Sequence, residues 1–367
     1  MKSWWHQTFR RLQGEPDSPP PGMALRTGAA ALAWLYGLGA WGRRRLYDRG
    51  WLSTSRLPCP VLSIGNLAVG GVGKTPITGM LAQRWQTAGC RVAIVSRGYG
   101  GKHSAPRIIS NGSRIFRKPP QAGDEAYLLA LQLPGIPIIT GADRHRAGLL
   151  AWKSFHPDLI LLDDGFQHFQ LHRDVDVVLL DADRPLGNGC LLPRGPLREP
   201  IGTLARPLVL ILTRYEAHRH QNSWEEVRAT FPQAIVLRAV FRLSHAVRYP
   251  GAYRVSLADL SGLRLVAVAG LARPQLFAAS LQEAGIISKE FFPFPDHHLF
   301  TGADLAELGA AACRLGAEGL VTTAKDWARL GGMRTGPLPW YVVHLQVNLL
   351  DDWPEHLLPE CGRILSD

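Results

Sequence analysis

The stretch 60–85 constrains this chain more than any other feature, because it reads as a strand, a glycine-rich turn and a helix in immediate succession. The apolar run 60–64 leads into Gly70-Gly71-Val72-Gly73-Lys74-Thr75, and helix-compatible residues begin at Ile77. This order is the context that a phosphate-binding P-loop requires. Glycines let backbone N–H groups curl around phosphate oxygens, and the helix N-terminus adds the positive end of its dipole. The pattern therefore predicts an α/β nucleotide-binding domain.

Each residue type in this loop has an expected task. We expect Lys74 to reach the β- and γ-phosphates and Thr75 to ligate Mg²⁺. Pro76 fits the first helical turn, where a missing N–H is tolerated. The loop departs from the full pattern at Ala68, where glycine is usual, and Val69 stands where one group of ATPases has lysine. The residues expected to hold the nucleotide phosphates are Gly70, Gly71, Val72, Gly73, Lys74 and Thr75.

Apolar runs of strand length recur through the first half of the chain. Most are continuous rather than alternating, which is typical of a parallel sheet covered on both faces. The expected strands are 61–65, 91–96, 136–140, 159–162, 175–180 and 208–213, with helices at 125–132 and 144–152 between them. We therefore predict an α/β fold with a P-loop NTPase-like parallel sheet core and right-handed crossovers.

With 367 residues the chain exceeds a typical single domain. After Thr213 the composition becomes polar and rich in histidine. A second set of expected strands follows at 235–241, 263–269, 319–323 and 340–347. Helices are expected at 275–284 and 303–315. We divide the chain into an N-terminal amphipathic extension (1–22), a P-loop core with an N-terminal helix (23–222), a smaller α/β domain (223–350) and a C-terminal tail (351–367).

The N-terminal region combines tryptophans with basic residues. Trp4, Trp5 and Phe9 recur at roughly helical spacing, and 27–42 runs without a charge up to the cluster 43–45 of three arginines. The uncharged run is short of the roughly 20 residues that span a bilayer. It favours an interfacial helix that associates with a membrane surface, and the alternative is a helix buried against the core.

The charge balance points to anionic ligands. The formal net charge is +11, and such an excess attracts polyanions, anionic lipid or phosphorylated substrates. The sequence shows no nucleic-acid-binding motif. Five scattered cysteines without a CxxC pair indicate neither a disulfide framework nor a zinc site, so we expect a reducing cytoplasm.

Carboxylates stand where the sheet would deliver them to a metal. The apolar run 159–162 ends in Asp163 and Asp164, an arrangement typical of a Walker B strand, which holds Mg²⁺ at the carboxyl edge of the sheet. The alternative is an ordinary turn at a strand end. Gln167 and His168 follow and are expected along the same edge.

Two further residues begin helices near that edge. Asp124 opens the helix 125–132, where it is either a helix cap or a general base. Arg144 follows the strand 136–140, and its guanidinium is suited to clamping a phosphate or to a surface ion pair.

Three polar segments have no single interpretation. The rigid loop 192–200 carries Arg198 and Glu199 and suits anion capture. The sequence Asp296-His297-His298 invites a metal site, but no further ligands have zinc spacing, so a catalytic or orienting histidine is favoured. The segment 322–326 follows a strand and is either structural or ligand-binding.

Together these segments resemble the tetraacyldisaccharide 4′-kinase family of lipid A biosynthesis. The similarity covers roughly residues 24–345, and the ordered co-occurrence of the motifs is more specific than any one of them. The matching segments are 35–37, 63–66, 70–76, 96–100, 123–125, 143–144, 162–168, 193–199, 269–274, 296–298 and 322–326. The departures are Ala68 and Val72, where the family commonly has Thr, and Ala324, where it has Glu.

The resemblance implies transfer of the γ-phosphate of ATP, with Mg²⁺, to the 4′-hydroxyl of an acylated glucosamine disaccharide 1-phosphate. It implies a peripheral enzyme on the cytoplasmic face of the bacterial inner membrane, whose partners are its lipid substrate and the membrane surface. It also implies that Asp124 and His297 act together as the base, with Thr75 and Asp163 or Asp164 on the metal. Arg144 would stabilise the transferred phosphoryl group, and Asn66, Gln167, His168, Arg198 and Glu199 are candidate substrate contacts.

Two other classes compete with this interpretation. A P-loop regulatory ATPase or GTPase would act on a protein partner, but the chain has no Asn-Lys-x-Asp guanine signature and no evident protein-binding motif. A non-catalytic membrane adaptor would not need both Gly73-Lys74-Thr75 and Asp163-Asp164.

Overall fold

The computed structural model describes residues 21–98, 105–203, 208–331 and 336–354, together with residues 8, 11–13, 19, 333 and 357. Within these ranges the strands form one 13-stranded sheet of order β11-β10-β12-β13-β8-β7-β6-β1-β5-β2-β4-β3, with β9 beside β8. Most of the extension 1–22 and of the tail 351–367, and Tyr99 and Gly100, lie outside the described residues.

The P-loop strand β1 (Val61–Asn66) lies at the centre of a parallel core. It is flanked by β5 (Leu159–Asp163) and β6 (Val175–Asp181), and the core continues to β2 (Val92–Ser96), β4 (Pro137–Thr140) and β7 (Leu208–Thr213). All residues of β1, β2, β4, β5 and β7 are buried, as continuous apolar runs require. The predicted parallel core is confirmed. The edge strand β3 (Arg107–Asn111), which the sequence analysis missed, is antiparallel to β4.

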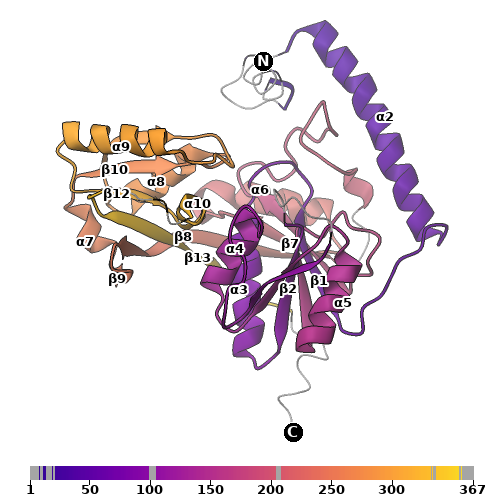
Figure 1. Cartoon of the computed structure of the whole chain (residues 1–367). Helices are drawn as coiled ribbons and strands as arrows, with labels where there is room; N and C mark the ends of the chain where they lie inside the picture. Colours follow the sequence, from indigo (N-terminus) through magenta and orange to yellow (C-terminus); the bar gives the residue numbers. More distant parts are fainter. Residues whose placement is uncertain are drawn as a thin grey trace.

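Helices cover this core on both faces. The helix α3 (Lys74–Thr87) buries Ile77, Leu81 and Trp85, residues spaced to lie on one helical face. Beside it lies α4 (Asp124–Gln132), and α5 (Arg144–Phe155) packs against β2 and β4 (Figure 1). Because the strands are parallel, the loops that follow β1, β5 and β6 meet at one edge of the sheet.

The second half of the chain continues the same sheet. Two long antiparallel strands, β8 (Ile235–Tyr249) and β13 (Trp340–Leu349), join the core through β7 and lead to β12 (Gly319–Thr323), β10 (Leu265–Ala269) and β11 (Ser288–Pro293). The strand expected at 235–241 thus extends to Tyr249. The helices here are α6 (Ala217–Thr230), α8 (Pro274–Glu283), α9 (Gly302–Arg314) and α10 (Ala324–Leu330), with the short elements η1 (Ile201–Thr203), β9 (Tyr253–Val255) and α7 (Ala258–Ser261).

The helix α2 (Met23–Asp48) stands away from the sheet (Figure 1). It buries Ala29 and Ala33, whereas its large apolar side chains, such as Trp34 (65% exposed) and Trp41 (51%), face outward. The alternative of a helix buried against the core is therefore wrong. Among the described residues, no helix is both long enough and apolar enough to cross a membrane.

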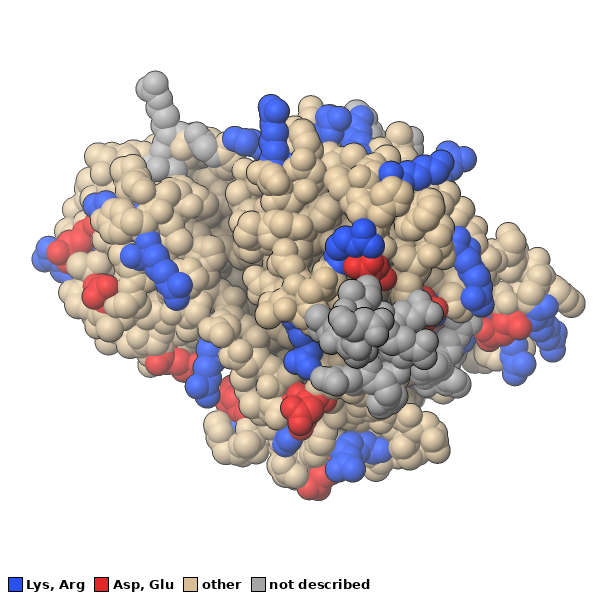
Figure 2. Space-filling model, turned by 90° about the horizontal axis from the view of Figure 1, so that it is seen from below, with Lys and Arg blue, Asp and Glu red and all other residues tan. Residues whose placement is uncertain are grey.

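Two arginines of the 43–45 cluster are turned towards the protein. Arg43 donates to the backbone oxygen of Gln167 at 3.3 Å, and Arg44 lies 3.6 Å from the Glu199 carboxylate. On the face shown in Figure 2, basic and acidic side chains are interspersed rather than gathered in one patch. The excess of positive charge therefore does not form a single polyanion-binding surface on this face.

Candidate active site

The P-loop is built around a left-handed glycine at the start of α3. Gly73 is the N-cap residue with φ 87°, a conformation that costs glycine little. A Cβ at this position would also overlap the Phe241 ring. The loop therefore brings the N-terminus of α3, with its orphan backbone N–H groups, to the carboxyl edge of β1, which is the geometry of an anion site.

The Lys74 ammonium lies among acceptors at this edge. Its Nζ atom is 3.1 Å from Oδ1 of Asn66 and 3.4 Å from Oδ1 of Asp164. Asn66 is the last residue of β1 and is fully buried, so its amide oxygen holds the lysine over the loop. An ammonium placed here is ready to contact phosphate oxygens.

The loop 193–199 supports the start of the P-loop through its backbone. Val69 N–H donates to the Pro196 oxygen, and Arg198 N–H donates to the Leu67 oxygen, both at 2.8 Å. Ala68 and Leu197 form an antiparallel bridge. The Ala68 departure from the P-loop pattern therefore falls on residues paired as in a strand, where glycine is not needed.

Asp163 ends β5 beside β1, in register with Ile64. Its carboxylate is buried and accepts from the Thr78 hydroxyl at 3.1 Å and the Ser96 hydroxyl at 3.4 Å. Burial, together with the negative charges of Glu125 and Asp164, raises the pKa of Asp163 to about 7. A cation beside Asp163 would therefore stabilise the charged form of this carboxylate, which burial and its acidic neighbours disfavour.

Asp164 turns the chain after β5 with φ 55°, an uncommon conformation for a residue with a side chain. This turn brings its carboxylate to Lys74, and it lines the cleft described below. Among the described residues no cluster of three or more His, Cys, Asp or Glu side chains can hold a metal. A cation at Asp163, Asp164 and Thr75 would complete its shell from phosphate oxygens and water, as Mg²⁺ commonly does.

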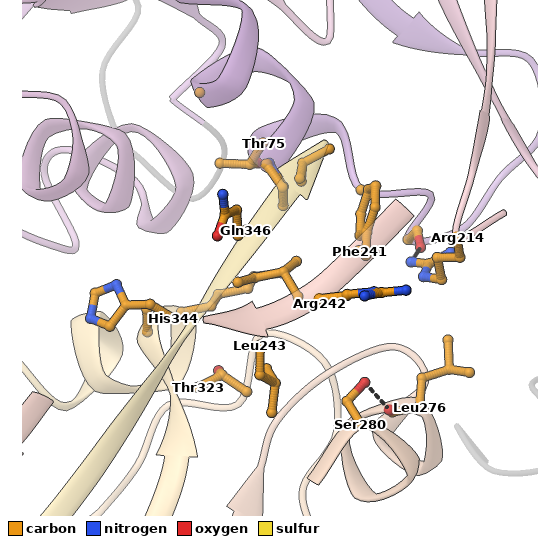
Figure 3. Close-up of a pocket in the computed structure, with 18 of the residues that line it drawn as sticks. Thr75, Arg214, Phe241, Arg242, Leu243, Leu276, Ser280, Thr323, His344 and Gln346 are labelled. Carbon is orange, nitrogen blue, oxygen red and sulfur yellow. Dashed lines mark hydrogen bonds between the residues drawn. The ribbon is translucent and has the colours of Figure 1, made fainter. Parts of the chain in front are cut away.

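A cleft of about 1680 Å³ lies between the P-loop and the second half of the sheet. One side is lined by residues 70–76, Glu125 and Asp164, and the other by Asp296, His297 and Lys325. Figure 3 shows Thr75 on one side of it, Thr323, Leu276 and Ser280 on the other, and the side chains of Phe241 and His344 between them. The cleft thus joins the phosphate-binding loop to the Asp296-His297 turn.

Asp124 and His297 meet beside this cleft. The His297 Nδ1 atom is 3.4 Å from Asp124 Oδ2, and the Arg329 Nε atom donates to the same oxygen at 2.9 Å. The α4 N-cap is Gly123, and no side chain caps this helix end. The alternative that Asp124 is only a helix cap is therefore wrong. Burial raises the Asp124 pKa, but the hydrogen bonds from His297 and Arg329 outweigh this effect and lower the pKa overall.

The two adjacent histidines have different partners. His297 lies in the left-handed region with φ 59°, which turns it towards Asp124, and such strain in a non-glycine residue is typical of functional sites. The Nε2 atom of His298 instead lies 3.0 Å from Asp304, the capping-box residue of α9. The structure pairs His297, not His298, with Asp124.

Arg144 is buried and His168 is half-buried, and both lie near the edge of the sheet that carries Asp163 and Asp164. Arg144 donates from Nη1 to the oxygens of Gly141 and Ala142, and its Nε atom has no hydrogen-bond partner. Burial and the neighbouring Arg97 lower the Arg144 pKa to about 10, against the opposing effect of Asp164 and Asp163. Burial and the charges of Arg144 and Arg173 lower the His168 pKa to about 4, so His168 is neutral at pH 7.

The remaining predicted residues form a chain of contacts from the P-loop to α2. Gln167 donates to the Asn66 backbone oxygen at 3.0 Å, and Arg198 donates to the Gln167 side-chain oxygen at 3.2 Å. Tyr36 of α2 donates to the Arg198 backbone oxygen at 2.9 Å. Glu199 is buried, and neither carboxylate oxygen has a hydrogen-bond partner, so burial raises its pKa. Asn66, Gln167, Arg198 and Glu199 do not line the large cleft.

The structure adds residues that the sequence analysis missed. Arg214 and Arg273 both bind Asp181 and both point to the backbone oxygen of Gly71, so they tie β6 and the second half of the chain to the P-loop. Asp181 ends an apolar strand much as Asp163 does, and this signal was present in the sequence. The sequence signal for Arg329 was weaker, and it is only that this arginine follows Asp326 by one helical turn.

The segment 322–326 proves to be a support for this region. Thr323 is the N-cap of α10 and donates to Asp326 at 2.7 Å, while Lys325 binds Asp296 at 3.2 Å. Thr323, Ala324 and Lys325 also line the cleft. The structure confirms the structural interpretation for Thr323 and Asp326, and ligand binding by the side chains that line the cleft stays a prediction.

Comparison with known proteins identifies similar chains over most of this length. The family profile described as Tetraacyldisaccharide-1-P 4′-kinase matches residues 26–361. The tetraacyldisaccharide 4′-kinase of Syntrophus aciditrophicus is 39% identical over 366 residues, which cover 96% of this chain and 97% of the relative. That of Geobacter sulfurreducens is 40% identical and covers 94% and 96%. A crystal structure of LpxK from Aquifex aeolicus in complex with ATP is 32% identical, with a TM-score of 0.74, and covers 93% of this chain and 99% of that one.

Proposed function

The chain belongs to the tetraacyldisaccharide-1-P 4′-kinase family, and on this premise we propose that it phosphorylates the 4′-hydroxyl of a tetraacylated glucosamine disaccharide 1-phosphate. The γ-phosphoryl group comes from ATP, and the product is lipid IVA of lipid A biosynthesis. The observation that carries this proposal is the Asp124–His297 pair, whose histidine lines the same cleft as the P-loop. A hydroxyl acceptor needs such a base, whereas a regulatory ATPase does not.

The P-loop residues 70–75 hold the ATP phosphates in this proposal. Their backbone N–H groups and the N-terminus of α3 face the phosphate oxygens, and Lys74 bridges towards the γ-phosphate. The residues at the edge of β5 fit Mg²⁺, because hard oxygen ligands from Thr75, Asp163 and Asp164 face the loop. The buried Asp163 carboxylate accepts hydrogen bonds from the neutral hydroxyls of Thr78 and Ser96, so its charge is available to a cation. Bound Mg²⁺ would neutralise charge on the β- and γ-phosphates.

Asp124 accepts the proton of the sugar hydroxyl. The oxygen of that hydroxyl forms a bond to the γ-phosphorus while the bond from this phosphorus to the bridging oxygen breaks, and ADP leaves. Its lowered pKa keeps Asp124 ionised at neutral pH, so the carboxylate carries no proton before the hydroxyl arrives. The same shift makes the carboxylate a weaker base, which gives His297 a part in the proton transfer. His297 orients the carboxylate and shares the charge change. We assign Arg144, whose Nε has no hydrogen-bond partner, to stabilising charge on the transferred group.

The lipid substrate enters beside α2. The contacts from Asn66 through Gln167 to Arg198 reach this helix, and the buried Glu199 lies next to Arg44. We assign Asn66, Gln167, His168, Arg198 and Glu199 to substrate recognition. The outward Leu32, Trp34, Leu35, Leu38 and Trp41 of α2 would lie in the interface of a membrane. On this basis and from the family we assign the enzyme a peripheral position on the cytoplasmic face of the bacterial inner membrane.

We retain the division into 23–222 and 223–350 as a proposal on domain organisation. The sheet itself passes through both parts, and the paired strands β8 and β13 connect them. The cleft lies between the P-loop on one side and residues 271–283, 296–297 and 323–325 on the other. A relative movement of the two parts would therefore change the width of the cleft.

Incubation of the purified chain with γ-labelled ATP and the disaccharide 1-phosphate in detergent micelles tests this function. Labelled lipid is the expected result, and it should be absent when the acceptor lacks a free 4′-hydroxyl. ATP hydrolysis without lipid labelling would instead support the regulatory ATPase class and overturn the kinase proposal.

A further inference from the structure

Arg329 lies in α10 and is fully buried: its side chain is 0% exposed. An arginine has five N–H donors in a rigid planar fork. Here five polar atoms, four of them oxygen acceptors, lie within 3.3 Å of the guanidinium nitrogens. They are Asp124 Oδ2 at 2.9 Å from Nε, Gly270 O at 2.6 Å and Asp326 Oδ1 at 3.1 Å from Nη1, and His297 Nδ1 at 3.2 Å and Asp296 Oδ1 at 3.3 Å from Nη2.

One edge of this fork is an anchor. Nη1 is held by the Gly270 oxygen and by Asp326, whose other carboxylate oxygen accepts from Thr323 at 2.7 Å and from the Gly270 N–H at 3.1 Å. Asp326 is fully buried, and it lies one turn before Arg329 on the same helix. The position of the guanidinium is therefore set by β10, β12 and α10 rather than by Asp124.

The other edge faces both members of the Asp124–His297 pair. Nε donates to Asp124, which belongs to α4 on the P-loop side, and Nη2 faces His297 and Asp296 on the opposite side of the cleft. Helix α10 packs directly against α4. A single rigid group thus spans the two parts of the chain that contribute the pair.

We propose that Arg329 is a positioning residue that fixes the distance and orientation between Asp124 and His297 for phosphoryl transfer. This inference rests on the proposed function and adds to it a residue that affects the reaction only through Asp124 and His297. A lysine could not do the same, because an ammonium is a single point that cannot reach the Gly270–Asp326 anchor and both members of the pair together.

The contacts also restrict the proton on His297. Its Nδ1 atom lies 3.2 Å from Arg329 Nη2 and 3.4 Å from Asp124 Oδ2. Arginine is a donor only, so Nδ1 accepts from Arg329 or donates to Asp124, but not both at once. Both contacts of Asp124 fall on Oδ2, so Oδ1 is the oxygen expected to face the sugar hydroxyl. The contact with Arg329 therefore bears on which tautomer of His297 is populated.

The charges around Asp124 come from three elements. Arg329 and Lys325 lie on α10 with Asp326, and His297 and Asp296 lie on the turn after β11. Glu125 is the neighbour of Asp124 on α4 itself. Lys325 is paired with Asp296, and His297 is charged only when it is protonated, so among these groups Arg329 is the permanent cation hydrogen-bonded to Asp124. Its removal should raise the Asp124 pKa and move the acid limb of the kcat/KM profile to higher pH.

The test compares Arg329→Lys and Arg329→Gln with the wild type, alone and combined with Asp124→Asn. Arg329→Lys should lower kcat by about 10- to 100-fold, the scale of a misplacement near 1 Å, with KM for ATP within about twofold. In the Asp124→Asn background the same change should cost less than about twofold, because groups that act as a unit are not additive. Arg238→Lys, which weakens another arginine–aspartate pair at Asp351, is the matched control and should leave kcat unchanged.

Full additivity of Arg329→Lys with Asp124→Asn, or lower thermal stability with unchanged kcat per folded molecule, would overturn the inference. A wild-type chain that labels no lipid would overturn the proposed function instead. Imidazole ¹⁵N shifts of His297 give a readout that needs no turnover. Arg329→Lys should change the tautomer ratio of His297 while Arg238→Lys does not, and an unchanged ratio would also reject the positioning role.

Discussion

The Thr78 hydroxyl donates to Oδ1 of Asp163 across 3.1 Å, which links the second turn of α3 to the end of β5. Both groups are buried, so this bond orients a carboxylate that has few other partners. We expect Thr78→Val to raise the Mg²⁺ concentration needed for half-maximal activity. It should also destabilise the fold by about 1–3 kcal/mol, the range for leaving a buried acceptor without its donor.

A magnesium titration of kinase activity, together with thermal unfolding without Mg²⁺, checks both parts of this prediction. Thr87→Val, at the end of the same helix, is a suitable control. An unchanged magnesium requirement in the Thr78 variant would show that Ser96 alone is enough to orient Asp163.

Lys74→Ala should abolish phosphoryl transfer and leave the fold intact. Its side chain is 20% exposed at the mouth of the P-loop, and its ammonium binds Asn66 and Asp164, not the core. The expected loss is on the order of 10²-fold or more, as for removal of one preorganised charge contact. Turnover measured on protein with normal thermal stability decides the matter: near-normal turnover would exclude a phosphate-binding role for Lys74.

Asp124→Asn and His297→Ala should each lower kcat strongly, and the double variant should be little worse than the worse single variant. Nucleotide affinity should change little, because neither side chain is assigned to the phosphates. His298→Ala is the control, since His298 binds Asp304 rather than Asp124. Independent, multiplying losses from Asp124 and His297, or a large kcat loss in His298→Ala, would contradict the assigned pair.

Replacing Trp34 and Trp41 with serine should weaken binding to anionic vesicles without changing ATP binding. These side chains are 65% and 51% exposed on α2, and interfacial tryptophans favour the headgroup region. Nearby arginines add roughly 1 kcal/mol each when they lie near anionic lipid. The replacement Tyr253→Ser, an exposed aromatic on β9, serves as the control. Equal loss of vesicle binding in both variants would indicate a nonspecific effect and not an α2 anchor.

Deletion of residues 1–22 should weaken association with the vesicles further.

The stacked histidines of the connecting strands should make the fold acid-sensitive. The rings of His245 and His344 are stacked with their centroids 4.7 Å apart. Burial is the main cause that lowers the His344 pKa to about 4, and the charges of His245 and Arg254 lower it further. An unfolded histidine takes up its proton near pH 6.5. Between these values the unfolded chain binds more protons than the folded chain, so stability falls as pH drops.

Thermal unfolding at pH 7.5 and pH 5 measures this dependence. His344→Gln should reduce the loss of Tm between the two values, whereas His218→Gln, whose side chain is 78% exposed, should not. The same pH dependence in the wild type and in His344→Gln would assign the acid sensitivity to other groups.

Local sequence patterns were enough to place the nucleotide half of the site. The order of strand, glycine turn and helix at 60–85 determines the P-loop, because its geometry depends on near neighbours. The strand 159–162 predicted where Asp163 would lie, because parallel strands bring their carboxyl ends to one edge. The same reasoning failed at β3 and β11, which lie at the sheet edges and are only partly buried, so their apolar pattern is weak.

The sequence also left open what only the folded chain decides. Asp124 and His297 are 173 residues apart, and no periodicity relates them. Their pairing, and the choice of His297 over His298, depends on the left-handed backbone at His297 and on the packing of α10 against α4. Arg329 is visible in the sequence only as a helical neighbour of Asp326. Local pattern sets elements and loops because it acts over a few residues, whereas the reacting groups meet through long-range packing, which a single sequence does not encode in any local signal.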